Sequence, residues 1–252
     1  MTTMTTELNT QAREVAWIAG VGASAGLGAA LARRFAEGGF RVAVTGRSPE
    51  RLAAIVEEIR AAGGEALALP GDASDEQAVA GLALRIAELG VLRVAIFNAA
   101  SGTRAPTLEL SADQFEQAWR TSTLGGFVFG KQALLSLLAN GGGTLLFTGA
   151  TASLRGRPPF AAFAAAKAAL RSLSQSFARE FGPQGVNVAH VIIAGGIDGE
   201  RLRLASPQRV AERGADGLLD PAAIAEAYWQ VHKQPRSAWS QEIDLRPYNE
   251  TF

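Results

Sequence analysis

Short runs of apolar residues alternate with longer amphipathic stretches along most of the chain. The apolar runs are rich in β-branched residues, and their length and composition predict buried strands at 15–19, 41–45, 66–70, 94–97, 143–147 and 186–193. The intervening stretches carry apolar residues at helical spacing and predict helices at 27–38, 49–62, 75–89, 112–138, 160–181 and 220–232. Glycine pairs such as Gly38–Gly39 and Gly63–Gly64 punctuate the predicted helix ends, where positive φ is wanted.

This alternation predicts an α/β fold, with a doubly wound parallel sheet covered by helices on both faces. No internal repeat, low-complexity linker or block of charge divides the 252 residues, so residues 14–252 are expected to form a single domain. Residues 1–13 are polar and threonine-rich, and we expect a flexible tail there, because an apolar signal-peptide core is missing.

Composition narrows the classes of function. The 24 basic and 24 acidic residues give a formal net charge of zero, which offers no electrostatic reason to expect nucleic acid or an anionic membrane as a partner. The chain has no cysteine and two histidines, so no disulfide and no metal site is expected. No apolar run reaches membrane-spanning length. We therefore expect a cytoplasmic protein that acts on a small molecule.

The first predicted strand leads into a glycine-rich turn that opens the first helix, Gly-Val-Gly-Ala-Ser-Ala-Gly-Leu-Gly over residues 20–28. Glycines let a backbone approach a pyrophosphate closely, and a helix N-terminus offers free N–H groups to it. A tight strand-to-helix turn without a ligand is the alternative, but the position after the first strand favours dinucleotide binding. The candidate cofactor-binding residues are Gly22, Ser24, Ala25, Gly26, Leu27 and Gly28.

The spacing Gly-x-x-x-Gly-x-Gly resembles that of the short-chain dehydrogenase/reductase family, and the resemblance extends from about Glu14 to Pro247. It implies a Rossmann-type fold and an oxidoreductase with a nicotinamide cofactor. Arg47 stands after the second strand, where a family member selecting NAD carries a carboxylate. A guanidinium pairs with a 2′-phosphate, so the resemblance implies NADP(H) rather than NAD(H). A solvent-exposed arginine opening the next helix is the alternative.

Two further segments resemble the family's cofactor-contacting segments. Asp72 and Ala73 follow the third strand, where the family contacts adenine, although Asp72 is equally suited to cap the next helix. Asn98 and Ala99 belong to a degenerate form of the family's Asn-Asn-Ala-Gly segment. The resemblance implies that Asn98 stabilises the loop beside the cofactor.

The catalytic positions are where the chain departs from the family. There, a tyrosine handles the proton, a serine holds the substrate oxygen, a lysine binds the nicotinamide ribose and an asparagine positions a water. By the surrounding residues, Lys167 is the lysine, while Phe163, Ala150 and Ser122 stand at the tyrosine, serine and asparagine positions. This degenerate set implies that ordinary tyrosine-dependent carbonyl reduction is not available.

Two hypotheses follow from an intact cofactor half and a degenerate catalytic half. The first is an NADP(H)-dependent oxidoreductase of non-standard or weak activity, in which Lys167 or an activated water handles the proton. The second is a non-redox pseudoenzyme that binds NADP(H) for sensing or as a scaffold. A third possibility is that the glycine-rich turn holds no nucleotide and that the pocket performs a non-redox reaction.

Other side chains near the site offer little as a replacement acid. Tyr228 is expected to pack within the last helix, and His190 is expected to be a core histidine with a backbone partner. The hydroxyls of Thr148, Thr151 and Ser153 are poor acids without an activating partner.

The resemblance also places a mobile substrate lid at residues 197–219. This segment carries Arg201, Arg203, Arg209 and Arg213, which suit either an acidic substrate or a solvated amphipathic helix. In the family, the alanine-rich helix at 160–181 and the long helix before it form a dimer interface, so a homodimer or homotetramer is expected.

Overall fold

Seven parallel strands form one sheet in the order β3-β2-β1-β4-β5-β6-β7, in the part of the chain that the computed structural model describes, residues 13–251. The strands are β1 (Glu14–Ala19), β2 (Arg41–Gly46), β3 (Glu65–Pro70), β4 (Val91–Phe97), β5 (Gly143–Thr148), β6 (Val186–Ile193) and β7 (Glu242–Leu245). The expected flexible tail lies outside the described residues except for Arg13, which pairs with Glu65.

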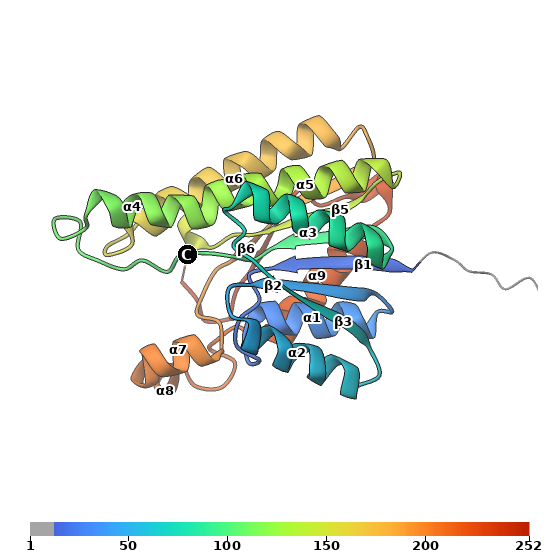
Figure 1. Ribbon diagram of the computed structural model, residues 1–252. Helices are drawn as coiled ribbons and strands as arrows, with labels where there is room; N and C mark the ends of the chain where they lie inside the picture. Colours follow the sequence, from blue (N-terminus) through green and yellow to red (C-terminus); the bar gives the residue numbers. More distant parts are fainter. Residues whose placement is uncertain (1–12, 252) are drawn as a thin grey trace, which may run out of the picture.

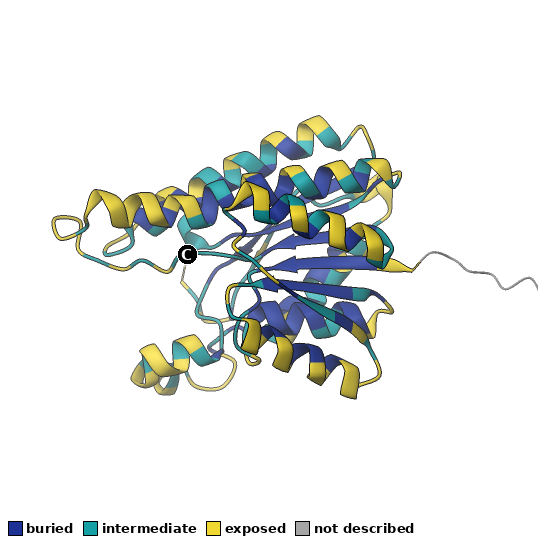
Figure 2. Ribbon diagram, in the orientation of Figure 1, coloured by how far each residue is buried: buried dark blue, intermediate teal, exposed yellow. Residues whose placement is uncertain are grey.

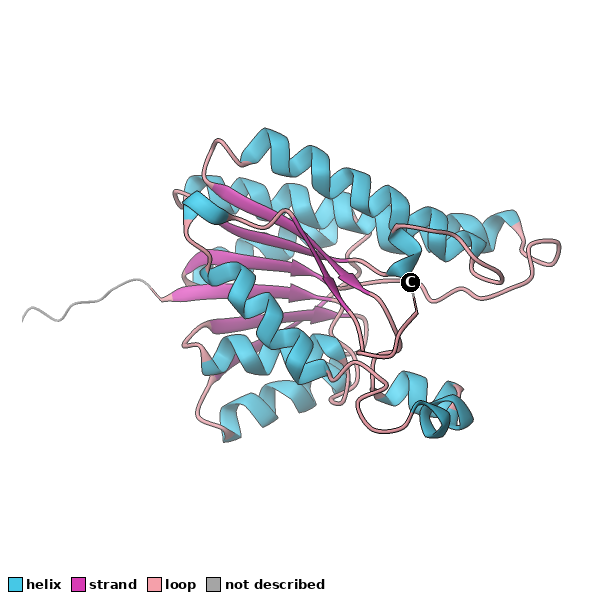
Figure 3. Ribbon diagram, turned by 180° about the vertical axis from the view of Figure 1, so that it is seen from behind, coloured by secondary structure: helices cyan, strands magenta, loops and turns pink. Residues whose placement is uncertain are grey.

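Helices cover both faces of the sheet, as Figures 1 and 3 show. One face is covered by α1 (Leu27–Glu37), α2 (Pro49–Ala61) and α9 (Pro221–Lys233), and the other by α3 (Glu76–Leu89), α5 (Gly125–Ala139) and α6 (Ala161–Phe181). Two further helices, α7 (Glu200–Ala205) and α8 (Pro207–Arg213), stand apart from both layers (Figure 1). The predicted doubly wound, Rossmann-type α/β domain is therefore confirmed.

The sheet is the centre of two apolar cores, one on each face. Every residue of β6 is buried, and β1 is buried from its second residue onward, so β1 is dark blue beyond its start in Figure 2. Strands that are buried on both faces need continuous apolar runs instead of alternation. This is why the β-branched runs of the sequence predict their positions to within about three residues.

The predicted helix over residues 112–138 forms with an interruption. It consists of α4 (Ala112–Trp119) and α5, joined by a π-helical turn, η1, at Arg120–Leu124. In this turn the Thr123 hydroxyl donates to the carbonyl of Ala166 on α6 at 2.9 Å, and Gly126, at the start of α5, lies close to Phe97 and Leu170. The extra residue of the turn rotates one half against the other while each half keeps its helical period.

The chain leaves β1 toward β2 and β3 and then crosses to β4 on the other side of β1. Between β1 and β4 the connections diverge, so a crevice opens at the carboxyl ends of these strands, which is the usual ligand position in such sheets. In Figure 3 the arrowheads point toward this edge, where α7, α8 and the C-terminal segment gather. None of the helices in the described chain is long and apolar enough to cross a membrane.

Candidate functional site

A cavity of about 780 Å³ lies at this edge, where the strand order reverses. Its wall comes from the segments that follow β1 to β6, from the start of α6, and from α7 and α8. A volume of this size is in the range of cofactor and substrate sites. The sequence-predicted residues that line it are Gly22, Gly26, Leu27, Gly28, Arg47, Asp72, Ala73, Asn98, Ala99, Ala150, Phe163 and Lys167.

The glycine-rich turn is built so that backbone faces the cavity. A Cβ at Gly28 would lie 2.8 Å from the carbonyl oxygen of Gly20, so only glycine allows α1 to start this close to β1. A Cβ at Gly22 would meet no atom within 4 Å, because Gly22 borders the open cavity. Helix α1 begins at Leu27 without a side-chain cap. The turn therefore offers a cradle and free N–H groups, which fit a pyrophosphate.

Two candidates from the same turn do not line the cavity. Ser24 is exposed, and its hydroxyl donates to the Glu58 carboxylate at 2.8 Å, while Arg33 donates to the Ser24 carbonyl at 2.9 Å. Ala25 is exposed beside it. The side chain of Ser24 thus ties the turn to α2, so any contact of Ser24 or Ala25 with a ligand would have to come from the backbone.

At the far end of the cavity, Arg47 and Asp72 face each other across the ends of β2 and β3. The alternative role of Asp72 as a helix cap is wrong, since Asp75 caps α3 by accepting from the N–H groups of Gln77 and Ala78 at 3.0 Å. Asp72 instead accepts from the N–H and hydroxyl of Ser74, both at 2.8 Å. Burial would raise the Asp72 pKa, but these bonds and the charge of Arg47 lower it overall.

Asn98 forms hydrogen bonds at the edge of the sheet where the strand order reverses. Its Nδ2 donates to the carbonyl of Gly20 at 3.0 Å, and its own N–H donates to the carbonyl of Ala19 at 2.9 Å. These bonds join the end of β4 to the start of the glycine-rich turn. The structure thus gives Asn98 the stabilising contacts that the sequence led us to expect.

Lys167 is the one charged side chain buried in the cavity wall, among the residues that the structure describes. It is 2% exposed, and its Nζ donates to the carbonyl oxygen of Thr148 at 2.6 Å. Burial lowers the pKa of Lys167 to about 7. The Phe163 ring lies one turn earlier on α6, with its centroid 5.9 Å from Nζ, and Ala150 lines the same cavity. Neither Phe163 nor Ala150 carries a hydroxyl, so Lys167 is the group beside them that can exchange a proton.

Ser122 does not join this group. It is fully buried in the π-helical turn, does not line the cavity, and its Oγ accepts from the N–H of Ser101 at 3.3 Å. The neighbouring Thr121 lines the cavity instead. Lys167, Phe163 and Ala150 therefore line the same cavity in the structure, whereas Ser122 does not.

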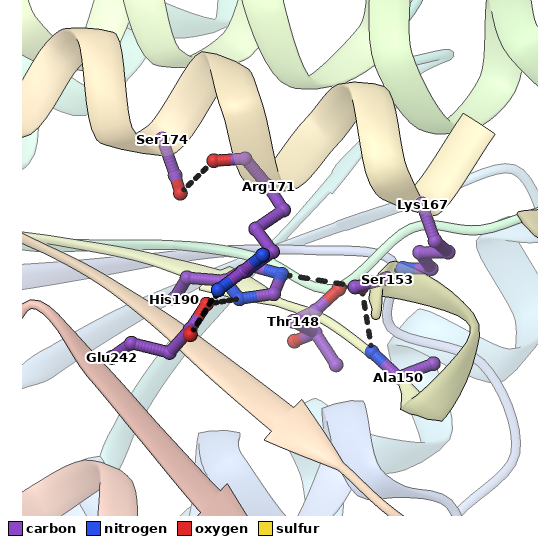
Figure 4. Close-up of polar contacts among 8 residues, drawn as sticks. All are labelled: Thr148, Ala150, Ser153, Lys167, Arg171, Ser174, His190 and Glu242. Atoms are coloured by element: carbon purple, nitrogen blue, oxygen red, sulfur yellow. Dashed lines mark hydrogen bonds and ion pairs between the residues drawn. The ribbon is translucent and has the colours of Figure 1, made fainter. Parts of the chain in front are cut away.

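Behind Ala150 lies a chain of polar side chains that the sequence did not predict (Figure 4). His190 is a core residue, as expected, but the expected backbone partner is wrong. Its Nδ1 faces Glu242 Oε2 at 2.9 Å and its Nε2 faces Ser153 Oγ at 3.4 Å. Arg171 holds Glu242 with two bonds of 2.6 and 2.7 Å. No local pattern in the sequence signals this chain, because Glu242 stands opposite His190 only once β7 pairs with β6.

The geometry assigns this chain a structural role. Burial lowers the pKa of His190 to about 4, so the ring is neutral near pH 7. The carboxylate can only accept, so Nδ1 carries the proton and Nε2 accepts from the Ser153 hydroxyl. Ser153 Oγ in turn accepts from the Ala150 N–H at 3.1 Å. Although a serine, a histidine and a carboxylate follow one another here, Ser153 is no nucleophile, because it is 5% exposed and does not line the cavity.

Residues 197–219, referred to below as the flap, contain α7 and α8 and contribute to the cavity wall. Ile197 and Leu219 pair as a parallel bridge, so the segment leaves and rejoins the domain at one place. Within it Arg203 pairs with Asp198 at 2.8 Å and Arg213 with Glu250 at 2.9 Å. The four arginines named from the sequence are thus divided, because Arg201 and Arg209 line the cavity instead.

Comparison with known proteins matches this architecture. The family model for short chain dehydrogenases matches residues 16–210. A short-chain dehydrogenase/reductase of Hericium erinaceus, eriH, is 36% identical over 171 residues, which cover 66% of this chain and 68% of that protein. The crystal structure of a short-chain dehydrogenase from Rhodopseudomonas palustris is 40% identical, with a TM-score of 0.79, and covers 94% of this chain and 99% of its own. A metagenomic short-chain oxidoreductase in complex with NADP is 25% identical, with a TM-score of 0.77 over 93% of this chain and 96% of its own.

Proposed function

This chain belongs to the short-chain dehydrogenase family of oxidoreductases, and from that premise we propose that it binds NADP(H) and transfers hydride by a proton path without tyrosine. The observation that carries the proposal is the buried Lys167, which lines the same cavity as the hydroxyl-free side chains of Phe163 and Ala150. A buried ammonium with one carbonyl partner is costly unless it serves a ligand or a reaction. The pocket therefore keeps the cation of the family's site without its tyrosine.

The cofactor preference rests on Arg47. Its exposed side chain opens on the cavity end that holds Asp72, and its guanidinium fork suits a 2′-phosphate. The residue directly after β2 is Arg47 and not a carboxylate, which in this position would bind the ribose hydroxyls of NAD. The related oxidoreductase whose structure contains NADP supports the same choice. Gly22 and the uncapped start of α1 would hold the pyrophosphate, and Lys167 the nicotinamide ribose.

When bound, NADPH supplies a hydride, with its two electrons, to a carbonyl carbon and leaves as NADP⁺, so the carbonyl oxygen needs one proton from elsewhere. Lys167 can give that proton directly or through a water in the volume left by the absent hydroxyls, because its pKa of about 7 lets it exchange protons near neutral pH. Tyr228 cannot, since it is fully buried, donates to the Thr148 hydroxyl at 2.8 Å, and has a pKa raised by burial.

The absence of hydroxyls at Phe163 and Ala150 limits the expected rate of carbonyl reduction. A positioned general acid contributes about 10²- to 10⁴-fold in rate. Loss of one donor to a developing oxyanion costs roughly 2–4 kcal/mol more, by analogy with oxyanion-hole deletions. We therefore expect slow turnover of ordinary ketones, with the binding of cofactor preserved.

A second candidate function is a pseudoenzyme that binds NADP(H) without transferring hydride. The observation that favours it is the state of the hydroxyls that flank Ala150. Thr148 Oγ1 accepts from Tyr228, and Ser153 Oγ is bonded to Ala150 and His190, so neither points to a substrate. A sensor or scaffold needs only the cofactor half of the site.

One experiment separates these candidates. Titration with NADPH and NADH should show tighter binding of NADPH, by about 10- to 100-fold if one charge-assisted pair with Arg47 is responsible. Phe163→Tyr combined with Ala150→Ser should then raise carbonyl reduction at least about tenfold, because the two hydroxyls return to a prepared site. Stereospecific hydride transfer from labelled NADPH by the unaltered protein excludes the pseudoenzyme, whereas tight binding without transfer excludes the oxidoreductase.

A substitution in the glycine-rich turn tests whether this turn binds the pyrophosphate. Gly22→Ala meets no protein atom, so it should fold normally but weaken NADPH binding by intruding on the cavity. If Gly22→Ala binds NADPH as the parent does, the pyrophosphate lies elsewhere. If the parent binds neither NADPH nor NADH, the chain is not a nucleotide-binding protein.

The proposal also includes a cytoplasmic location and assembly into a homodimer or homotetramer. Large apolar side chains are exposed on the outer side of α4 and α5, namely Phe115, Trp119, Phe127 and Leu135. Helices at this position form the subunit interface in the family, and covering such side chains would contribute favourable free energy to association.

A further inference from the structure

Arg104, Arg157, Arg201 and Arg209 line the cavity from three separate segments, and the first two lie near an aromatic ring. The guanidinium carbons of Arg104 and Arg157 lie 5.8 and 6.0 Å from the ring centroid of Phe160. Arg201 comes from α7 and Arg209 from α8, and both line the same cavity. Both Arg104 and Arg157 are exposed, and their guanidinium groups lie near the same ring.

Arg201 reaches across the mouth of the cavity. A Cβ placed on Gly102, in the segment after β4, would overlap the Arg201 guanidinium. The start of α7 lies against the glycine-rich turn, since a Cβ at Gly199 would come within 2.9 Å of the Ala25 carbonyl. The flap therefore spans the cavity from the pyrophosphate cradle to the wall that carries Arg104.

Among residues 13–251 these four arginines have no carboxylate at ion-pair distance, in contrast to Arg203 and Arg213 of the flap. The nearby carboxylates are engaged with other arginines: Asp198 with Arg203, Glu250 with Arg213 and, at 3.5 Å, Glu200 with Arg51. Around the whole cavity eight basic residues face three acidic ones, although the chain as a whole carries no net charge. Positive charge is thus concentrated at this site.

Like charges ordered around one cavity repel each other, and an anion placed among them removes that cost. The planar guanidinium fork matches the oxygens of a carboxylate or a phosphate better than other groups. Gly22, the start of α1 and Arg47 would hold the phosphates of the proposed cofactor. These residues follow β1 and β2, whereas Phe160 follows β5 on the other side of β4 in the sheet. The four arginines are therefore left for the substrate.

We propose that the substrate of this protein is an anionic carbonyl compound, or the matching alcohol, whose carboxylate or phosphate group is bound by Arg104, Arg157, Arg201 and Arg209. The rings of Phe160 and Phe163 contact its apolar part. The reacting carbon lies toward Lys167. The inference rests on the proposed function, because bound NADP(H) supplies the hydride that makes the ligand a substrate.

The test uses the full chain and three benzaldehydes that differ in their para substituent. Binding of 4-formylbenzoate, 4-formylphenyl phosphate and the neutral methyl 4-formylbenzoate is measured by calorimetry with NADP⁺ present, and NADPH oxidation is followed separately. We expect an anionic aldehyde to bind at least about tenfold tighter than the ester. Whichever of the two anions binds more tightly identifies the group as carboxylate or phosphate.

Variants on two separate segments assign the effect to the arginines. Arg104→Met and Arg201→Met should each lower the preference for anion over ester by about tenfold. Arg203→Met is the matched control, because it removes a charge from the short helix that also carries Arg201. Arg203 pairs with Asp198 outside this cavity, so its loss should leave the preference unchanged.

Failure of this inference is distinct from failure of the proposed function. Equal binding and reduction of ester and anions would overturn the inference and leave the oxidoreductase standing. An anion preference without NADPH oxidation would uphold the anion site and remove the oxidoreductase. A loss of NADPH affinity in Arg104→Met and Arg201→Met equal to the loss of anion affinity would assign these arginines to the cofactor and overturn the inference.

Discussion

The burial of Lys167 affects both the stability of the fold and the ability of this side chain to transfer a proton. Its ammonium has one hydrogen-bond partner, the Thr148 carbonyl, and almost no contact with water. Burial favours the neutral amine. The pKa of Lys167 is therefore lowered from 10.5, the value of a free lysine, to about 7. The same property makes it a proton carrier near pH 7.

This predicts an unusual pH dependence of stability. The unfolded lysine keeps its proton up to a pKa of 10.5, whereas the folded one releases it near 7, so the unfolded state binds more protons between these values. The free energy of unfolding should therefore rise with pH from about 7 to 10, by about 1.4 kcal/mol per pH unit at most. Above pH 10 the raised pKa of Tyr228 acts in the opposite direction.

Urea denaturation of the cofactor-free protein across this range measures the effect. Lys167→Met keeps the length of the side chain without a titrating group, so its stability should be flat where that of the parent rises. A parent curve with no rise between about pH 7 and 10 would contradict the buried state of Lys167.

At this scale the sequence predicts the site in part. Phe163 and Lys167 lie four residues apart on one helix, so helical geometry alone brings them to one face. Ala150 follows a strand end, where sheet topology sends it to the cavity. Spacing assigns Ser122 to the same site, but the π-helical turn rotates it out of the cavity wall, and no periodicity in the sequence signals such a turn.

Among the elements, β7 has a role larger than its four residues suggest. Glu242 at its start accepts from Arg171 on α6 and from His190 on β6, and through Ser153 this chain ends at the N–H of Ala150. A strand at the edge of the sheet thus holds the turn that forms one wall of the cavity. Networks of this kind are rigid only while every member has its partner.

Glu242→Ala should therefore destabilise the fold by about 2–3 kcal/mol, because it leaves His190 and Arg171 without their shared acceptor. Thermal or urea unfolding measures this loss. Asp198→Ala is the control from an exposed pair with Arg203, and its cost should stay below about 1 kcal/mol. Equal effects of the two substitutions would mean that the edge strand does not support the wall.

At the scale of the whole molecule, the order of the strands follows from simple rules. Apolar runs alternating with helices require a parallel sheet, and right-handed crossovers then place helices on both faces. Two features depend instead on which segments lie side by side in the fold. One is the chain of polar contacts from Glu242 to Ala150, and the other is which flap arginines form ion pairs and which line the cavity. Such pairings join residues far apart in the sequence, so no local pattern contains them.

The exposed apolar side chains of α4 and α5 carry the prediction for assembly. Trp119→Glu combined with Phe127→Glu places charge on this face and should convert an oligomer into a monomer, as measured by size-exclusion chromatography with light scattering. Leu84→Glu on α3 alters a side chain that is 71% exposed elsewhere and should keep the parent mass. A parent protein that is already monomeric at micromolar concentration would contradict the proposed assembly.

The pairing of Ile197 with Leu219 at the two ends of the flap affects how the sequence of this protein can evolve. Ile197 and Leu219 are neighbours, and the backbone of 196–198 bonds to Leu219 at 2.8 Å in both directions, so the intervening residues form a loop tied at its base. Insertions, deletions or a transplanted segment between these two residues leave the sheet and its cores untouched. The part of ligand choice that depends on Arg201 and Arg209 can therefore change by sequence changes in the flap without changes to the sheet.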